Sequence, residues 1–231
     1  MAVTHVATVS AYSASSVGPL SMSSTLDVAT GDYLIGFVGY ETRSSSVTVT
    51  DGGSISLTVG TEFKHPSSTN YSRMIYGAAA SANSTATFTA TWDPTCGYRP
   101  FILFQFRPDS GDTPSVDDSD VTSGTGTSIA SPAISTTGDD VVVVGAMKNW
   151  SNGGTLSSYA IGGEAATGAS IGSNLGAAWY RILSATASDI TATVSHTVSG
   201  QWNAHILAVK FTAAAGLSIP VAMHHYRKLR S

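Results

Sequence analysis

The sequence predicts an all-β protein: two tandem antiparallel β-sandwiches of the jelly-roll type, produced by an internal duplication, followed by an extended C-terminal tail. Composition is the first reason. Charged residues make up only 11% of the 231 residues, and 23 are glycine. Apolar residues occur in short runs between Gly, Ser and Asn instead of recurring every three or four positions. Such runs favour strands over helices.

Alternation along the chain is the second reason. Residues 85–92 (TATFTATW) and 190–196 (ITATVSH) alternate small polar with apolar side chains. Strict alternation is typical of a strand with one buried and one solvated face. Turn signals such as Asp-Gly-Gly at 51–53 and Asn-Gly-Gly at 152–154 separate these runs at the spacing of a sandwich.

An internal repeat is the third reason. The triplet Thr-Gly-Asp followed by an apolar run occurs at 30–40 and again at 137–147. The alternating segments recur in the same order, and the closing apolar runs at 102–106 and 207–211 match as well. Ordered matches at a nearly constant offset predict a duplication.

The repeat predicts one sandwich in residues 1–108 and a second in 127–213. Between them, residues 109–126 carry five aspartates and no apolar run, so we expect a solvated acidic linker. These aspartates lack the order of ligands of an EF-hand loop, and turn formation is preferred to calcium binding.

Four valines at 141–144 are apolar on both faces of the expected strand. A strand with one solvated face would alternate, so both faces are expected to be covered. The cover is the other sandwich, another subunit or a long loop.

Charge and cysteine content exclude several classes of function. The net charge is −4, and three of the 11 basic residues lie in the last five positions, so the body is acidic. Without a basic face, nucleic acid is not an expected partner. Cys96 is the single cysteine, which excludes an intrachain disulfide and a cysteine metal site. No apolar run is long enough for a membrane helix, and the N-terminus lacks the pattern of a secretory signal, so we expect the protein to be made and assembled in the cytoplasm.

The sequence contains no convincing catalytic motif. Residues 168–172 match G-x-S-x-G around Ser170, but the flanks lack the strand and helix of a nucleophile elbow. The few glutamates are not paired as in glycosidases. His224 and His225 are adjacent and point to opposite sides of an extended chain, which disfavours chelation of one ion. We therefore expect no enzyme activity, no metal and no cofactor.

Aromatic residues offer a binding surface. Trp92 and Trp179 fall on apolar phases and are predicted to be core residues. Trp150 and Trp202 lie beside Gly, Ser and Asn in expected loops, where they are candidates for stacking on a glycan or for anchoring a protein partner.

The tail, residues 214–231, is apolar and then basic, which is unusual for a disordered end. Its run SIPVAMHHY is predicted to dock on the sheet edge or in the groove of a partner, with the basic residues facing an acidic surface. The candidate partner-binding residues are Leu217, Ile219, Pro220, Val221, Met223, Tyr226, Arg227, Lys228 and Arg230.

The duplicated Thr-Gly-Asp pattern, the low charge, the abundance of Ser, Thr and Gly and the ending GLSIPVAMHHYRKLRS resemble the tandem jelly-roll or sandwich proteins on virions of tailed bacteriophages. The resemblance implies a non-enzymatic virion component that decorates the capsid or belongs to a head or tail fibre. Its partners would be other virion proteins and copies of itself in a homo-oligomer, commonly a trimer. The alternative is a carbohydrate-binding or receptor-binding adhesin that recognises a host-surface glycan through its loop aromatics.

Overall fold

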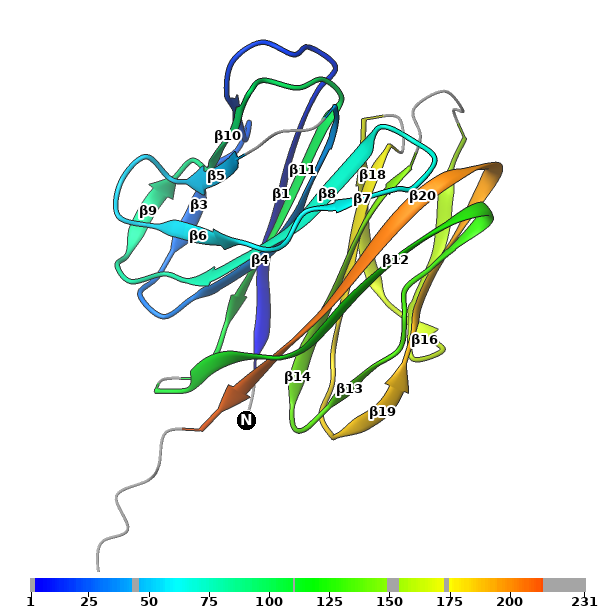
Figure 1. Cartoon of the computed structure of the whole chain (residues 1–231). Helices are drawn as coiled ribbons and strands as arrows, with labels where there is room; N and C mark the ends of the chain where they lie inside the picture. The colour runs from blue at the N-terminus through cyan, green and yellow to red at the C-terminus, as the bar shows by residue number, and fades with distance from the viewer. Residues whose placement is uncertain (1–2, 43–45, 110, 149–153, 173–174, 214–231) are drawn as a thin grey trace, which may run out of the picture.

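The computed structural model describes residues 3–42, 46–109, 111–148, 154–172 and 175–213, which contain strands and loops and no helix (Figure 1). The predicted all-β class is confirmed. The first-half strands are β1 (Thr4–Ser13), β2 (Leu20–Ser21), β3 (Leu26–Val28), β4 (Tyr33–Glu41), β5 (Ser46–Thr50), β6 (Ser56–Val59), β7 (Phe63–Lys64), β8 (Asn70–Ala78), β9 (Asn83–Ala86), β10 (Thr89–Asp93) and β11 (Arg99–Arg107). The second-half strands are β12 (Thr113–Ala130), β13 (Ile134–Thr136), β14 (Asp140–Lys148), β15 (Leu156–Ile161), β16 (Glu164–Ala165), β17 (Thr167–Ile171), β18 (Gly176–Ile182), β19 (Ala187–Ile190) and β20 (Ala192–Thr212).

The first sandwich is one antiparallel sheet folded over on itself. Its strand order is β1-β11-β4-β8-β6-β5-β10-β2, and β6 pairs with both β8 and β5, so the sheet bends there into a second layer. Leu34, Phe101 and Trp92 are among the side chains buried between the two layers. Trp92 is thus a core residue, as its phase in the sequence predicts.

The second sandwich is built in the same way from fewer, longer strands. Its order is β16-β15-β20-β14-β18-β17, with β12 also paired to β20. The strands β12 and β20 are 18 and 21 residues long and run through both layers. Trp179, another predicted core residue, is fully buried between those layers with Val144 and Ile206.

The pairing pattern of the first half is repeated in the second. In the small sheet β3·β9, Leu26 pairs with Ala86, and in β13·β19 Ile134 pairs with Ile190. The ladders β4·β8 and β5·β10 have counterparts in β14·β18 and β15·β20. The register identifies equivalent residues, and it supports the duplication read from the sequence.

A β-bulge repeats at the same place in both halves. Strand β1 shifts register against β11 between His5 and Ala7, and β12 shifts against β20 between Val116 and Asp118. An extra residue at the same point of both strands marks them as equivalent, with Val116 in the place of His5.

The expected acidic linker is wrong. Residues 113–130 form β12, which pairs with β20 from Thr113 opposite Thr212 to Ala130 opposite Thr193. The aspartates have a structural use: Asp117 accepts hydrogen bonds from the backbone and hydroxyl of Thr137. Charged side chains are common on edge strands, where they block pairing with foreign chains, so an acidic segment without apolar alternation concealed an edge strand.

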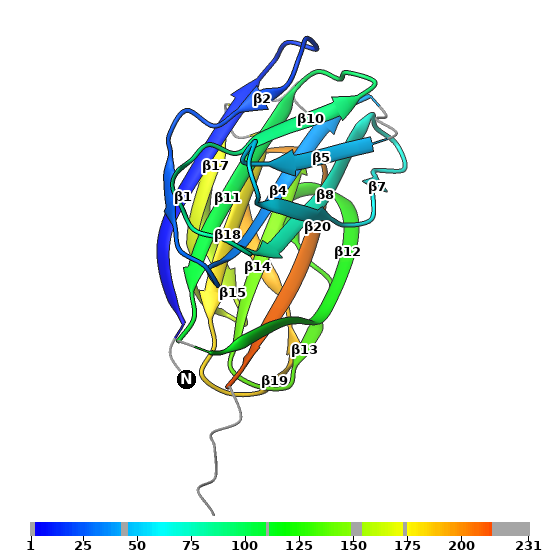
Figure 2. The ribbon, with the colours of Figure 1, turned by 90° about the vertical axis from the view of Figure 1, so that its left-hand side faces the viewer.

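The two sandwiches pack face to face through their inner sheets, β1-β11-β4-β8 and β12-β20-β14-β18-β17 (Figures 1 and 2). A third apolar cluster fills this interface. Val141 and Val143 belong to it, whereas Val142 and Val144 face the core of the second sandwich. The other sandwich therefore covers the outer face of the valine run, one of the covers expected.

The interface is pseudo-symmetric, because each half presents the same face to the other. Strand β4 contacts its equivalent β14, and the contact of β8 with β14 is mirrored by that of β18 with β4. A Cβ added to Gly145 would lie 2.4 Å from the Phe37 ring, and one added to Gly39 would lie 2.8 Å from Met147 Sδ. Register makes Gly145 the equivalent of Phe37, and Met147 that of Gly39. Each half thus fills the gap left by the other's glycine.

Candidate functional site

The face-to-face interface has two rims, and one of them is closed by aromatic side chains. At this closed rim, between β1 and β17, the imidazole of His5 stacks on Tyr180 with ring centroids 4.7 Å apart. It also contacts the ring of Phe104 edge-on. The ring of Tyr12 lies 2.5 Å from where a Cβ of Gly172 would be. These rings pack between the two sheets at this rim.

The opposite rim is open. Between the β6–β7 segment and β12 lies a hollow of about 330 Å³, which we call the open groove. Figure 1 shows the four strands that frame it, β7 and β8 on one side and β12 and β20 on the other. Its lining residues are Gly60, Thr61, Glu62, Phe63, Met74, Tyr76, Ser119, Asp120, Val121, His205, Ile206 and Leu207.

Substitutions between equivalent positions explain why one rim is open. Val116 stands where the other rim has His5, and Ser123 stands where it has Tyr12. Tyr76 is the equivalent of Tyr180, because these tyrosines pair with the equivalent residues Ile35 of β4 and Val143 of β14. Two rings that close one rim are thus replaced by small side chains at the other.

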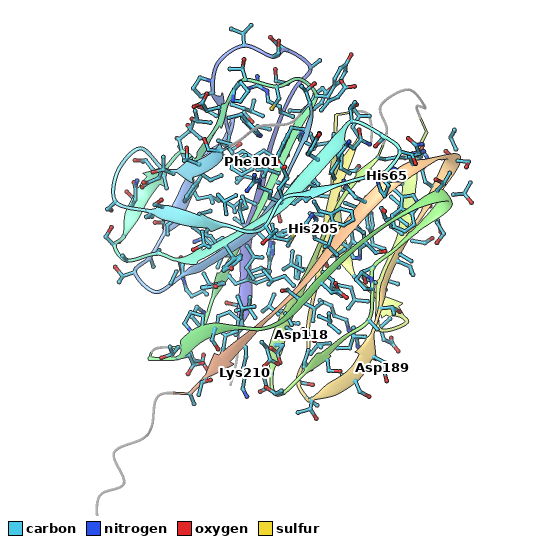
Figure 3. The ribbon with its side chains drawn as sticks, viewed as in Figure 1. His65, Phe101, Asp118, Asp189, His205 and Lys210 are labelled. Atoms are coloured by element: carbon cyan, nitrogen blue, oxygen red, sulfur yellow. The ribbon has the colours of Figure 1, made fainter. Side chains whose placement is uncertain are left out.

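A buried histidine forms part of the groove lining. His205 is 6% exposed, and its Nε2 shares a hydrogen bond of 2.9 Å with Ser72 Oγ of the other half (Figure 3). Phe63 meets the His205 ring edge-on, with centroids 6.1 Å apart. Burial lowers the pKa of His205 to about 4, so its ring is neutral at pH 7. It is therefore a fixed, uncharged part of the groove.

A second contact between the halves lies near the groove. His65, in the loop between β7 and β8, donates from Nε2 to the carbonyl oxygen of Gly124 in β12 at 3.2 Å (Figure 3). The backbone N–H of Ser67 donates to its Nδ1, which orients the ring. This contact ties the β7 side of the groove to β12 and fixes its width.

The residues proposed from the sequence for glycan binding do not form a site here. Trp202 is 7% exposed and lies in β20, so it cannot present a ring face to a sugar; the loop expected around it is wrong. Its ring packs where a side chain on Gly124 would be, 2.4 Å from the added Cβ. Trp150 lies outside the described residues, as do the tail positions Leu217, Ile219, Pro220, Val221, Met223, Tyr226, Arg227, Lys228 and Arg230.

One buried polar pair was not anticipated. Lys148 is 2% exposed, and its Nζ lies 2.6 Å from His196 Nδ1 and also donates to the carbonyl of Val198. Burial lowers the pKa of both Lys148 and His196. The only sequence signal was a lysine ending an apolar run, which resembles an exposed strand end.

Two described side chains with potentially nucleophilic atoms, Ser170 and Cys96, lie outside the arrangements that usually activate such atoms. Ser170 is exposed in the edge strand β17, not in a strand-to-helix turn. Burial raises the pKa of the Cys96 thiol to about 12, so it is protonated at pH 7. Within the described ranges, no group of His, Cys, Asp or Glu is arranged to hold a metal ion.

Comparison with known proteins gives no relative: no family model, curated protein or solved structure matches the chain. In the part of the chain that the structure describes, no helix that could cross a membrane is found.

Proposed function

We propose that this protein is a non-enzymatic structural component of a tailed-bacteriophage virion, a capsid-decorating or tail- or fibre-associated protein that acts by assembling with copies of itself and other virion proteins. The observation that carries the proposal is the pair of long strands, β1 and β12, at the ends of their inner sheets. Each has a strand partner on one side among the described residues.

Such edges are suited to strand addition. An edge strand offers a row of backbone N–H and C=O groups, and a partner's extended segment pairs with them. Strand β1 contains no Asp, Glu, Lys or Arg, whereas β12 contains three aspartates and no basic residue. The apolar segment 217–226 suits the pairing edge, and Arg227, Lys228 and Arg230 would face the acidic strand β12 of a neighbour.

Removal of the tail tests this proposal. The full chain and a chain ending at Ala213 are compared by light scattering after size-exclusion chromatography and by thermal unfolding. We expect an oligomer for the full chain, a monomer for the truncated chain and similar unfolding temperatures. A full chain with Arg227, Lys228 and Arg230 changed to Glu is the matched control for charge, and we expect weaker assembly. An oligomer that persists without the tail would reject tail-mediated assembly.

The alternative function is a carbohydrate-binding or receptor-binding adhesin. Burial of Trp202 removes one of its two proposed aromatics. The open groove, with Tyr76 in its lining, is the observation that favours this second candidate.

A further inference from the structure

We propose that the open groove is a saccharide-binding site in which one neutral sugar ring stacks on Tyr76, in the place that the His5 imidazole occupies on Tyr180 at the closed rim. This inference stands apart from the assembly proposal, because it concerns the β8 and β12 rim and not the tail.

The closed rim shows what shape the open groove accepts. The His5 ring lies nearly flat on Tyr180, with an interplanar angle of 24°. At the open rim the equivalent tyrosine, Tyr76, is half-buried and has no ring contact with another described residue. The equivalent of His5 is Val116, which is 40% exposed and carries no ring to stack on Tyr76. A flat group of about the size of one ring therefore fits between Tyr76 and β12.

The polar side chains that line the groove indicate which class of flat ligand it favours. Thr61 lines one wall beside Glu62, whose Oε2 is already bonded to Tyr40 and Arg73, and Ser119 and Asp120 line the other. Side-chain hydroxyls donate hydrogen bonds to the hydroxyls of a sugar and accept them, and carboxylates accept them. No lysine or arginine is among the lining residues, which disfavours phosphate, sulfate and nucleotides.

The apolar part of the lining suits the face of a pyranose. Phe63, Met74 and Leu207 join Tyr76 in a floor of aromatic and aliphatic side chains. An aromatic floor with polar walls is the arrangement expected for a ring that is apolar on its faces and polar at its edge. The volume of about 330 Å³ lies at the lower end of the ~300–1,000 Å³ of small-ligand sites, which suits one sugar residue.

The test is titration of the full chain, followed by ligand-observed NMR and calorimetry. The probes are methyl α- and β-glucopyranoside, methyl β-galactopyranoside, N-acetylglucosamine and N-acetylgalactosamine, each at up to about 10 mM, which detects a Kd of ~1 mM. N-acetyl-tyrosinamide is the comparison probe for an aromatic side chain of a protein partner.

Two variants locate the binding. Val116→His places an imidazole where His5 lies at the closed rim and should fill the groove without removing any lining residue. Tyr76→Ala removes the stacking surface. The matched control is Val6→His, because Val6 is 41% exposed on the equivalent strand and next to His5, away from the groove.

We expect at least one sugar probe to bind the unmodified chain and the control variant equally. We expect at least a roughly tenfold loss of affinity in Val116→His and in Tyr76→Ala. The proposal is overturned if no sugar probe binds, if binding survives Val116→His, or if N-acetyl-tyrosinamide binds the groove more tightly than every sugar. The oligomeric mass of each variant is measured in parallel. A loss of sugar binding with unchanged mass separates this site from tail-mediated assembly.

Discussion

The two halves share strand pairing and an interface face, yet they stabilise the same buried aspartate differently. Asp32 precedes β4 and accepts two hydrogen bonds from Arg107, each 2.7 Å long. Its equivalent, Asp140, stands at the start of β14, where Lys210 replaces Arg107. The Lys210 ammonium bonds to Thr137 instead, and Asp140 Oδ1 is buried with no hydrogen-bond partner among the residues that the structure describes.

The pKa values of these two carboxyls move in opposite directions. Burial raises the pKa of Asp32, but hydrogen bonds from Arg107, Ala29 and Gln105 outweigh it and leave the pKa lowered. Burial, together with the nearby charge of Asp117, raises the pKa of Asp140 to about 6. The two halves thus share the same strand pairing, but only the first has a basic side chain, Arg107, bonded to the buried aspartate.

The two cores also differ at the C-terminal ends of the equivalent strands β4 and β14. In the first sandwich Tyr40 packs edge-on against Trp92 and donates its hydroxyl to Glu62. Register places Lys148 and His196 at the equivalent positions of the second sandwich. A neutral aromatic pair in one half corresponds to a buried ammonium beside an imidazole in the other.

The largest expected effect concerns the glycines that fit the halves together. Phe37→Gly leaves a cavity in the apolar interface opposite Gly145 and should lower the free energy of unfolding by about 4 kcal/mol. Gly145→Phe should destabilise by overpacking, because its new ring meets Phe37.

The double variant Phe37→Gly with Gly145→Phe moves the ring to the other half and should recover at least 2 kcal/mol, roughly half of the loss. Chemical unfolding of the four proteins measures this. Strictly additive losses would mean that the two equivalent positions do not complement each other.

Loss of the Arg107 guanidinium should have the next largest effect. Arg107→Ala leaves the buried Asp32 carboxylate without its ion-pair partner. The cost should be about 2 kcal/mol, below the ~3–5 kcal/mol of a fully buried pair, because the Arg107 side chain is 44% exposed. The matched variant Lys210→Ala should cost less than about 0.5 kcal/mol. Equal effects in urea unfolding at pH 7 would contradict the asymmetry.

The pH dependence of stability should separate the aspartates. The raised folded pKa of Asp140 means that the native state binds the proton more tightly, so stability falls as pH rises from about 4 to about 6. Asp140→Asn should therefore be more stable than the unmodified protein by about 2 kcal/mol above pH 6, and no more stable near pH 3.

Asp32 should behave in the opposite sense. Its lowered folded pKa gives stability that is complete above the unfolded pKa of about 4 and is lost as pH falls through the folded value. Asp32→Asn should thus be less stable at pH 7, with the deficit shrinking in acid. Parallel pH profiles of thermal unfolding for the two asparagine variants would show that burial, and not pairing, governs both sites.

The sequence was sufficient for the class, the repeat and the covered valine strand, because these depend on the period of apolar residues and on order along the chain. It failed for residues 113–130, where small polar side chains and aspartates hide a strand whose stability comes from pairing with β20. It failed also for Trp202, whose Ser, Gly and Asn neighbours resemble a loop but belong to one continuous 21-residue strand.

The open groove was beyond sequence reasoning for a different reason. It depends on comparing His5 with Val116, and that alignment is visible only in the matching bulges of β1 and β12. The sequence repeat is weak in these two strands, so the sequence does not reveal that His5 and Val116 are equivalent. Complementarity between Phe37 and Gly145 is likewise a property of two surfaces and not of either segment.

The smallest expected effect is at Lys148, where the second sandwich holds a cation in place of Tyr40. Burial lowers the pKa of this lysine, so between its folded pKa and the ordinary value of about 10.4 the unfolded chain binds more protons. Stability contributed by this site therefore rises with pH across that window. Lys148→Met keeps the length of the side chain and removes the charge, at the loss of its hydrogen bonds to His196 and Val198. We expect the free energy of unfolding to rise by about 1 kcal/mol or less at pH 7, and the gain to disappear near pH 10.4, measured as the difference between two urea-unfolding curves at each pH.

Tyr40→Phe is the matched change in the first sandwich. It should lower the free energy of unfolding by about 1 kcal/mol, because it removes the hydroxyl that bonds Glu62 and Arg73. A loss of several kcal/mol in Lys148→Met would mean that the ammonium stabilises its sandwich. Lys148 and Tyr40 would then both stabilise their cores, and the two cores would differ only in the chemistry of the buried group.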